Sequence, residues 1–225
     1  GKSHRRLWST RLELYERLKI HGDIEHVRNM FQHGTVVTLP THLSNLDSIL
    51  IGYALDSVVG LPAFAYGAGL NLYESEIFAF YMTRLGAYRV DRRKKNPIYL
   101  DSLKIMSQVM LERGTNSLFF PGGTRSRSGE IERELKYGVL NSLLSAQRSI
   151  YEHGGNQKII VVPLILGYHC TLEAQSLISG YLKSTGEEKY VSSARKGFKV
   201  RNILSFAWKF FSQSNEIHLS FGEPM

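Results

Sequence analysis

The sequence has almost no cysteine: Cys170 is the single one in 225 residues. One cysteine cannot close a disulfide within the chain, and it cannot build a thiolate metal site. A cysteine hydrolase is also poorly supported, since Cys170 follows His169 with no activating group beside them in the sequence. We expect a reducing, cytosol-facing setting.

Long apolar runs are missing as well. The most apolar stretch, 46–61, contains Asp47 and Asp56, whereas a transmembrane helix needs about 18 or more consecutive apolar residues. No transmembrane helix is therefore predicted. Hydrophobic residues still make up 43% of the chain, and a chain of this length can bury one core, which predicts a single domain overall.

Acidic residues are in deficit, since 20 Asp and Glu face 28 Lys and Arg, a formal net charge of +8. Such a balance favours contact with phosphates, anionic membranes, nucleic acid or an acidic carrier protein. Nucleic acid is the least supported of these partners, because the aromatic residues are scattered through apolar stretches and do not alternate with the basic ones. We expect no nucleic-acid binding.

Apolar, β-branched stretches alternate along the chain with stretches of helical periodicity. Strands are predicted at 35–40, 117–121 and 159–166, with a late or edge strand at 216–222, and helices at 46–55, 75–84, 97–113 and 137–152. This order predicts an α/β fold with a mostly parallel or mixed central sheet covered by helices, and with its chemistry in the loops beyond the strand ends.

The N-terminal stretch differs from the rest. Apolar residues in 7–33 recur at loosely helical spacing among many charges, so we expect residues 1–34 to form an amphipathic helical lead-in and residues 35–225 to form the α/β domain. Because this stretch is basic and carries Trp8, it also predicts peripheral attachment to an anionic membrane surface.

A histidine and an aspartate follow the first predicted strand. His42 lies just past the strand, and Asp47 lies near the start of the next predicted helix. A histidine can take a proton from an alcohol, while a carboxylate on its other ring nitrogen fixes the tautomer and stabilises the imidazolium. The pair therefore suits acyl transfer without a serine nucleophile. The plainer alternative is that Asp47 only favours a helix N-terminus and that His42 is a loop residue.

A glycine-rich basic loop follows the second predicted strand. Residues 120–129 combine glycines with Arg125, Arg127 and three hydroxyl side chains, and contain no acidic residue. Backbone amides, hydroxyls and planar guanidinium groups together suit a small anion such as phosphate. The loop lacks the ending of a nucleotide-binding loop and is not a nucleophile elbow. The alternative is a flexible basic surface turn. The basic cluster 89–95 could supply a second clamp.

Four blocks, in this order, resemble those of the glycerol-3-phosphate and lysophosphatidate acyltransferase superfamily: PTHLSNLD at 40–47, GAYRVDR at 86–92, FPGGTRS at 120–126 and VPL at 162–164. The resemblance covers roughly residues 35–168 and includes a family-like FGEP ending at 221–224. The third block departs from the usual pattern at Gly122, where the family usually carries a glutamate.

The resemblance implies a role for each matching residue. His42 would be the general base and Asp47 its orienting partner, Arg92 and Arg125 would contact the acceptor phosphate, and Gly123, Thr124 and Ser126 would complete the phosphate loop. Pro163 lies in the block linked to acyl-donor binding. No metal and no bound cofactor is implied.

The activity implied is transfer of a fatty acyl group from acyl-CoA or acyl-carrier protein to a hydroxyl of glycerol-3-phosphate in phospholipid biosynthesis, at the inner, cytoplasmic face of the cell membrane. About 35 residues separate the third and fourth blocks, which favours the glycerol-3-phosphate branch. Two alternatives stay open. One is a lysophosphatidate acyltransferase, and the other is a non-catalytic module that binds anionic lipid through the same loops.

Overall fold

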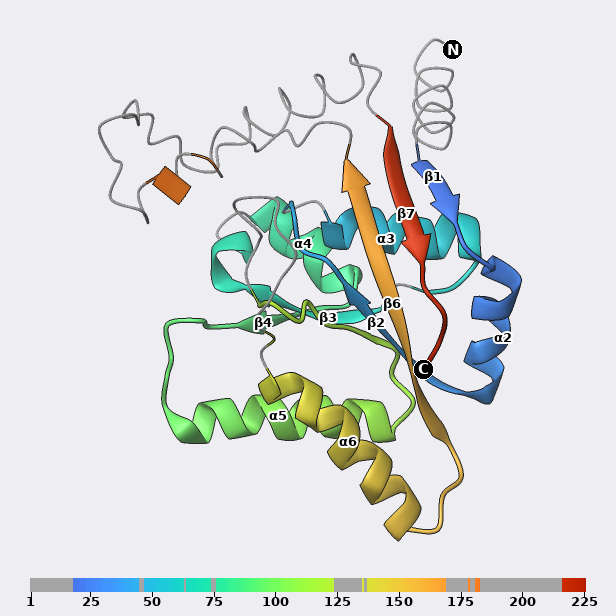
Figure 1. Ribbon diagram of the computed structural model, residues 1–225. Helices are drawn as coiled ribbons and strands as arrows, with labels where there is room; N and C mark the ends of the chain where they lie inside the picture. Colours follow the sequence, from blue (N-terminus) through green and yellow to red (C-terminus); the bar gives the residue numbers. More distant parts are fainter. Residues whose placement is uncertain are drawn as a thin grey trace.

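A computed structural model of the chain describes residues 18–44, 47–62, 64–73, 76–123, 135, 137–168, 178, 181–182 and 216–225. These residues form a seven-stranded sheet of order β1-β7-β6-β2-β5-β3-β4 (Figure 1). The strands are β1 (Leu18–His21), β2 (Gly34–Pro40), β3 (Ala65–Gly69), β4 (Ala87–Val90), β5 (Ser117–Leu118), β6 (Lys158–Tyr168) and β7 (Ile217–Phe221).

The sheet is mostly parallel, with β6 and β7 as its antiparallel pair. The whole of β2 lies against β6, from Gly34 opposite Lys158 to Pro40 opposite Leu164. Beyond that point β6 runs on to Tyr168, which pairs with β7. This arrangement confirms the predicted fold class, a mostly parallel or mixed central sheet.

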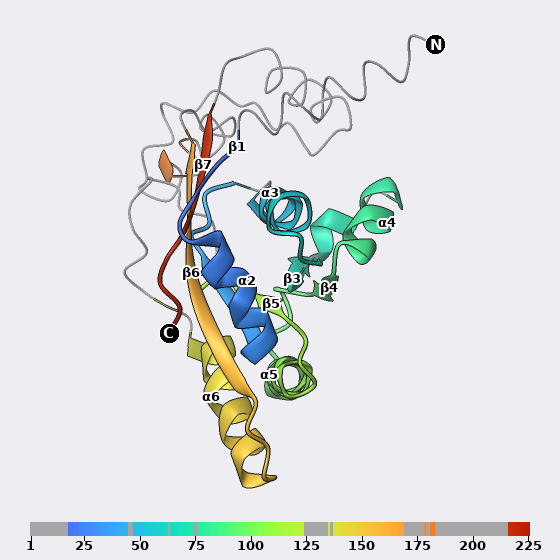
Figure 2. The ribbon, with the colours of Figure 1, turned by 90° about the vertical axis from the view of Figure 1, so that its right-hand side faces the viewer.

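Helices cover both faces of the sheet, as the sequence predicts (Figures 1 and 2). One face carries α2 (Ile24–His33), α3 (Asp47–Ala54) and α4 (Glu76–Arg84), and the other carries α5 (Pro97–Glu112) and α6 (Tyr137–Glu152). A π-helical turn, η1 (Leu55–Val59), extends α3, and a 3-10 turn, η2 (Leu70–Tyr73), precedes α4. The helices expected at 75–84, 97–113 and 137–152 are thus present as α4, α5 and α6.

The central strand β2 shows why its sequence is apolar at consecutive positions. Val36 packs with Ile51 of α3 in one core cluster, whereas its neighbour Val37 packs with Leu111 of α5 and Ala146 of α6 in the other. Successive side chains of a strand point to opposite faces, so a strand covered on both faces has apolar residues at adjacent positions. Both valines are fully buried.

The sequence does not predict β1, β3 and β4. Residues 18–21, inside the expected helical lead-in, form a strand that is held by parallel pairing with β7 at the far end of the chain. Strand β3 reads Ala-Tyr-Gly-Ala-Gly, which lacks the β-branched residues that mark a strand. Within the described part of the lead-in, residues 24–33 form the helix α2. Residues 1–17 lie outside the described residues, and the boundary at residue 35 stays a prediction.

The parallel strands bring their carboxyl ends to one edge of the sheet. β2, β5, β3 and β4 all point toward this edge, and β6 reaches it with Tyr168. The residues just beyond these strands therefore lie along one line of loops, which is the usual place for a site in such a sheet. His42, Arg92 and the loop beginning at Phe120 all follow strands of this group.

Candidate active site

Two hydrogen bonds fix the position of the chain just after β2. Thr41 donates its backbone N–H to the carbonyl of Leu164 at 3.1 Å, and its hydroxyl accepts the backbone N–H of Leu166 at 3.3 Å. These bonds keep the chain against β6 for one residue past the end of β2. His42 is consequently fixed at the sheet edge, with 12% of its side chain exposed.

His42 and Asp47 are in hydrogen-bond contact. The Nδ1 atom of His42 lies 2.9 Å from Oδ2 of Asp47. The same oxygen accepts the backbone N–H groups of Leu43 at 2.7 Å and of Ser44 at 2.9 Å. A buried carboxylate is costly unless donors surround it, and the Asp47 side chain is fully buried. Residues 42–44, just after β2, therefore supply the donors that this carboxylate needs.

The contact determines which ring nitrogen of His42 can act as a base. Because an ionised carboxylate can only accept hydrogen bonds, we assign the proton of neutral His42 to Nδ1, which donates it to Oδ2 of Asp47. The Nε2 atom then carries the lone pair. A substrate hydroxyl placed at Nε2 could transfer its proton there, and the resulting imidazolium would be stabilised by the carboxylate behind it.

Two aromatic residues complete the surroundings of the pair. The ring of Phe120 stacks on the His42 ring, with 4.0 Å between ring centroids and 25° between ring planes. The hydroxyl of Tyr168 donates to Oδ1 of Asp47. The sequence places both residues in or beside the family blocks but assigns them no role, because only the register of β6 and the path of the loop after β5 show these contacts.

The glycine loop begins next to His42. Gly123 donates its backbone N–H to the carbonyl of Phe120 at 2.9 Å, which closes a turn through Pro121 and Gly122. Gly123 has a φ of +70°, a left-handed value that favours glycine. Thr124, Arg125 and Ser126 lie outside the described residues. The described part of the loop thus connects the residue stacked on His42 directly to the predicted phosphate-binding residues.

Arg92 lies in an exposed turn after β4. Two of its neighbours are engaged, since Arg93 pairs with Asp91 at 3.2 Å and Lys94 lies over the Tyr99 ring at 5.4 Å. Hydrogen bonds from the Arg93 side chain, and then from its backbone N–H, hold the pKa of Asp91 below its usual value. Within the described ranges Arg92 has no carboxylate partner.

The sheet order gives the approximate distance between the ends of the two strands that precede Arg92 and His42. β4 is three positions from β2, and neighbouring strands lie about 4.8 Å apart, so the two strand ends are on the order of 14 Å apart. The structure therefore brings His42 and Asp47 together and puts Gly123 in the adjoining loop. It does not bring Arg92 into contact with the pair.

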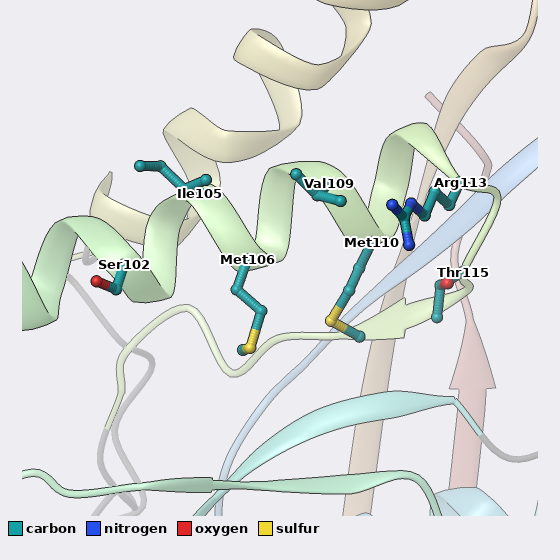
Figure 3. A pocket seen from close by; sticks show the side chains of 7 residues that line it. All are labelled: Ser102, Ile105, Met106, Val109, Met110, Arg113 and Thr115. Atoms are coloured by element: carbon teal, nitrogen blue, oxygen red, sulfur yellow. The ribbon is translucent and has the colours of Figure 1, made fainter.

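A pocket of about 590 Å³ opens along α5, away from these residues (Figure 3). Its lining is mainly apolar, with Met106 and Met110 directed toward β5 and with Arg113 and Thr115 at one end. Neither His42 nor Asp47 lines it. No helix within the described residues is long and apolar enough to cross a membrane, and no cluster of metal-ligating side chains occurs in that same part of the chain.

Comparison with known families identifies the class of protein that has this α/β sheet and this histidine–aspartate pair. The model of the acyltransferase family matches residues 17–167, and the chain belongs to this family. Among solved structures, the chain is similar to the 1-acyl-sn-glycerophosphate (LPA) acyltransferase PlsC from Thermotoga maritima, with a TM-score of 0.48 and 14% identity. The match covers 94% of this chain and 62% of that chain.

Proposed function

We propose that this protein is an acyltransferase of lipid synthesis that moves a fatty acyl group from a thioester to a hydroxyl of glycerol-3-phosphate. The observation that carries this proposal is the bond between His42 Nδ1 and the fully buried Asp47 carboxylate. That bond leaves Nε2 as the basic atom at the carboxyl edge of the sheet. Family membership independently supports acyl transfer as the reaction.

In the proposed reaction His42 Nε2 removes the proton of the acceptor hydroxyl as its oxygen attacks the thioester carbonyl carbon. Backbone N–H groups near the glycine loop stabilise the resulting oxyanion. The carbon–sulfur bond then breaks, and the imidazolium returns its proton to the leaving thiolate. The products are an ester and a free thiol, and the histidine ends neutral. No metal or bound cofactor is needed in this scheme.

The acceptor phosphate is proposed to bind Arg92, Arg125 and the loop residues Gly123, Thr124 and Ser126. Three features support this assignment. Arg92 has no carboxylate partner among the described residues, the turn at Gly123 starts beside the ring stacked on His42, and arginine binds phosphate through two parallel hydrogen bonds. Holding the phosphate away from His42 would direct the glycerol hydroxyl toward Nε2, and positioning of this kind supplies much of a rate enhancement.

The acyl donor is proposed to be acyl-CoA or acyl-carrier protein, and the protein is proposed to act at the inner face of the cell membrane. Both donors present an anionic group to a chain with a net charge of +8. An apolar product also needs a bilayer to receive it. Attachment would be peripheral and would depend on the basic N-terminal stretch.

Thiol release tests the proposal directly. The chain would be incubated with a panel of acyl-CoAs and acyl-carrier proteins, with glycerol-3-phosphate and lysophosphatidate as competing acceptors. We expect thiol release that depends on glycerol-3-phosphate. Preference for lysophosphatidate would move the assignment to the other branch of the superfamily. Binding of anionic vesicles without any thiol release would instead support a non-catalytic lipid-binding module and overturn the proposal.

A further inference from the structure

We propose that Tyr168 is a positioning residue of the acyl-transfer site, which acts on His42 through Asp47. This inference rests on the proposed function, in which His42 is the base. Its basis is one contact, the donation of the Tyr168 hydroxyl to Oδ1 of Asp47. That oxygen is the one that His42 does not touch.

The two oxygens of Asp47 have different surroundings. Oδ2 accepts from the His42 ring and from the backbone N–H groups of Leu43 and Ser44, all three contributed by the turn that follows β2. Oδ1 accepts from Tyr168, a residue of another strand, and within the described residues it has no other donor. Loss of the Tyr168 hydroxyl would therefore leave one oxygen of a fully buried carboxylate without a partner.

The register of β6 brings the hydroxyl to this place. Strand β6 passes the last residue of β2 at Leu164 and continues for four residues to Tyr168. In this extension Gly167 lies opposite His218 and Tyr168 lies opposite Ile217 of β7. The buried side chains of Leu166, Ile217 and Leu219 anchor both strands in the main core cluster. Tyr168 thus links the C-terminal strand to the histidine–aspartate pair.

The contact has two chemical consequences. It fixes the rotation of the carboxylate, and so the direction in which Oδ2 faces the His42 ring. It also draws negative charge toward Oδ1, because a donor to an anionic oxygen stabilises the charge where it sits. Without the hydroxyl more of the charge would face Nδ1–H, and the protonated ring would persist to higher pH. Since the base must be neutral, the acid limb of the rate profile would then move to higher pH.

The test compares Tyr168→Phe with Tyr66→Phe in the full chain. Tyr66 is a control because it is a buried tyrosine of the core cluster against which Tyr168 packs, and its hydroxyl bonds to the sulfur of Met82 at 3.1 Å and to the side chain of Ser48, not to Asp47. We expect Tyr168→Phe to lower kcat by about tenfold or more, because even a small misplacement of a catalytic group can cost about 10²-fold in rate. The acceptor KM should stay within about twofold, and the acid limb should move upward. Tyr66→Phe should leave that limb in place.

A second readout does not depend on turnover. Nitrogen NMR of the His42 ring reports its tautomer and its titration in wild type and in both variants. We expect the titration midpoint to rise only in Tyr168→Phe. If that variant fails to fold, a singly fluorinated tyrosine at position 168 keeps the ring and the hydroxyl but makes the hydroxyl a stronger donor, so the midpoint should move to lower pH.

The outcomes separate the two proposals. Wild-type thiol release that His42→Ala abolishes, together with an unchanged rate profile and titration in Tyr168→Phe, would overturn the role of Tyr168 and leave the proposed function standing. Absence of thiol release from the wild type would overturn the proposed function. In that case an unshifted His42 titration in Tyr168→Phe would refute the positioning role as well, and a shifted one would support it.

Discussion

The two ends of the proposed site differ in how completely the protein surrounds its charges. At the β2 end, the Asp47 carboxylate is fully buried and accepts hydrogen bonds from His42, two backbone N–H groups and Tyr168. At the β4 end, Arg92 lies exposed in a turn. A group that moves protons needs fixed geometry before substrate arrives. A group that binds phosphate can leave its charge in water until the ligand comes, because water solvates it at no cost to the fold.

The largest effect is expected at the enclosed end, from His42→Ala. Loss of a general base typically costs about 10²–10⁴ in rate, while the residues proposed to bind phosphate are untouched. Acyl transfer measured by thiol release should fall by that factor, and glycerol-3-phosphate binding measured by calorimetry should remain. His153→Ala is the matched control, because His153 lies in an exposed turn after α6 and bonds to the backbone of Ser149. Activity of His42→Ala within about tenfold of wild type would contradict the base role.

Asp47→Asn should come next, with a loss of about 10²-fold or more. Three N–H donors converge on the position of Oδ2, so the asparagine oxygen should occupy it and the amide nitrogen should face Tyr168. The shape is then kept, but the negative charge that stabilises the imidazolium is lost, and the histidine tautomer is no longer fixed as strictly. Asp56→Asn, at an exposed residue of η1, is the control. Equal kcat values for Asp47→Asn and Asp56→Asn would argue against a catalytic role for the pair of His42 and Asp47.

A smaller and more selective effect is expected from a residue proposed to bind the acceptor phosphate. Arg125→Lys should raise the acceptor KM by about tenfold and the donor KM by much less, because an ammonium group cannot reproduce a two-pronged guanidinium contact with phosphate. Steady-state kinetics with each substrate varied in turn measures both constants. Arg93→Lys is the control, since Arg93 is already paired with Asp91. Equal changes in the two KM values would indicate that Arg125 does not bind the acceptor phosphate.

The smallest effect should be on membrane attachment. Exposed basic residues are screened within about 8–10 Å at physiological ionic strength, so the fraction of protein that pellets with anionic vesicles should fall severalfold as salt rises. Deleting residues 1–17 should lower it further; the deletion stops there because Leu18 begins β1. If neither salt nor the deletion changes the pelleted fraction, the N-terminal stretch packs on the domain instead.

The sequence predicts the elements whose signal is local. β2 and β6 are rich in β-branched and other apolar residues, and α4, α5 and α6 show helical periodicity, so their positions follow from the residues alone. β1 and β3 do not, since a four-residue edge strand and a strand of small residues depend on their neighbours for stability. The pairing of β1 with β7 in particular joins the two ends of the described chain.

The same division holds for the site. The spacing of His42 and Asp47, the glycines of the loop and the basic residues around Arg92 are legible in the sequence, because each belongs to a short segment that follows one strand. The contacts of Tyr168 and Phe120 with this pair are decided only by tertiary structure. Tyr168 reaches Asp47 because the register of β6 on β2 and β7 carries it past the end of β2, and a register between distant strands is set by packing of the whole sheet, which no local pattern encodes.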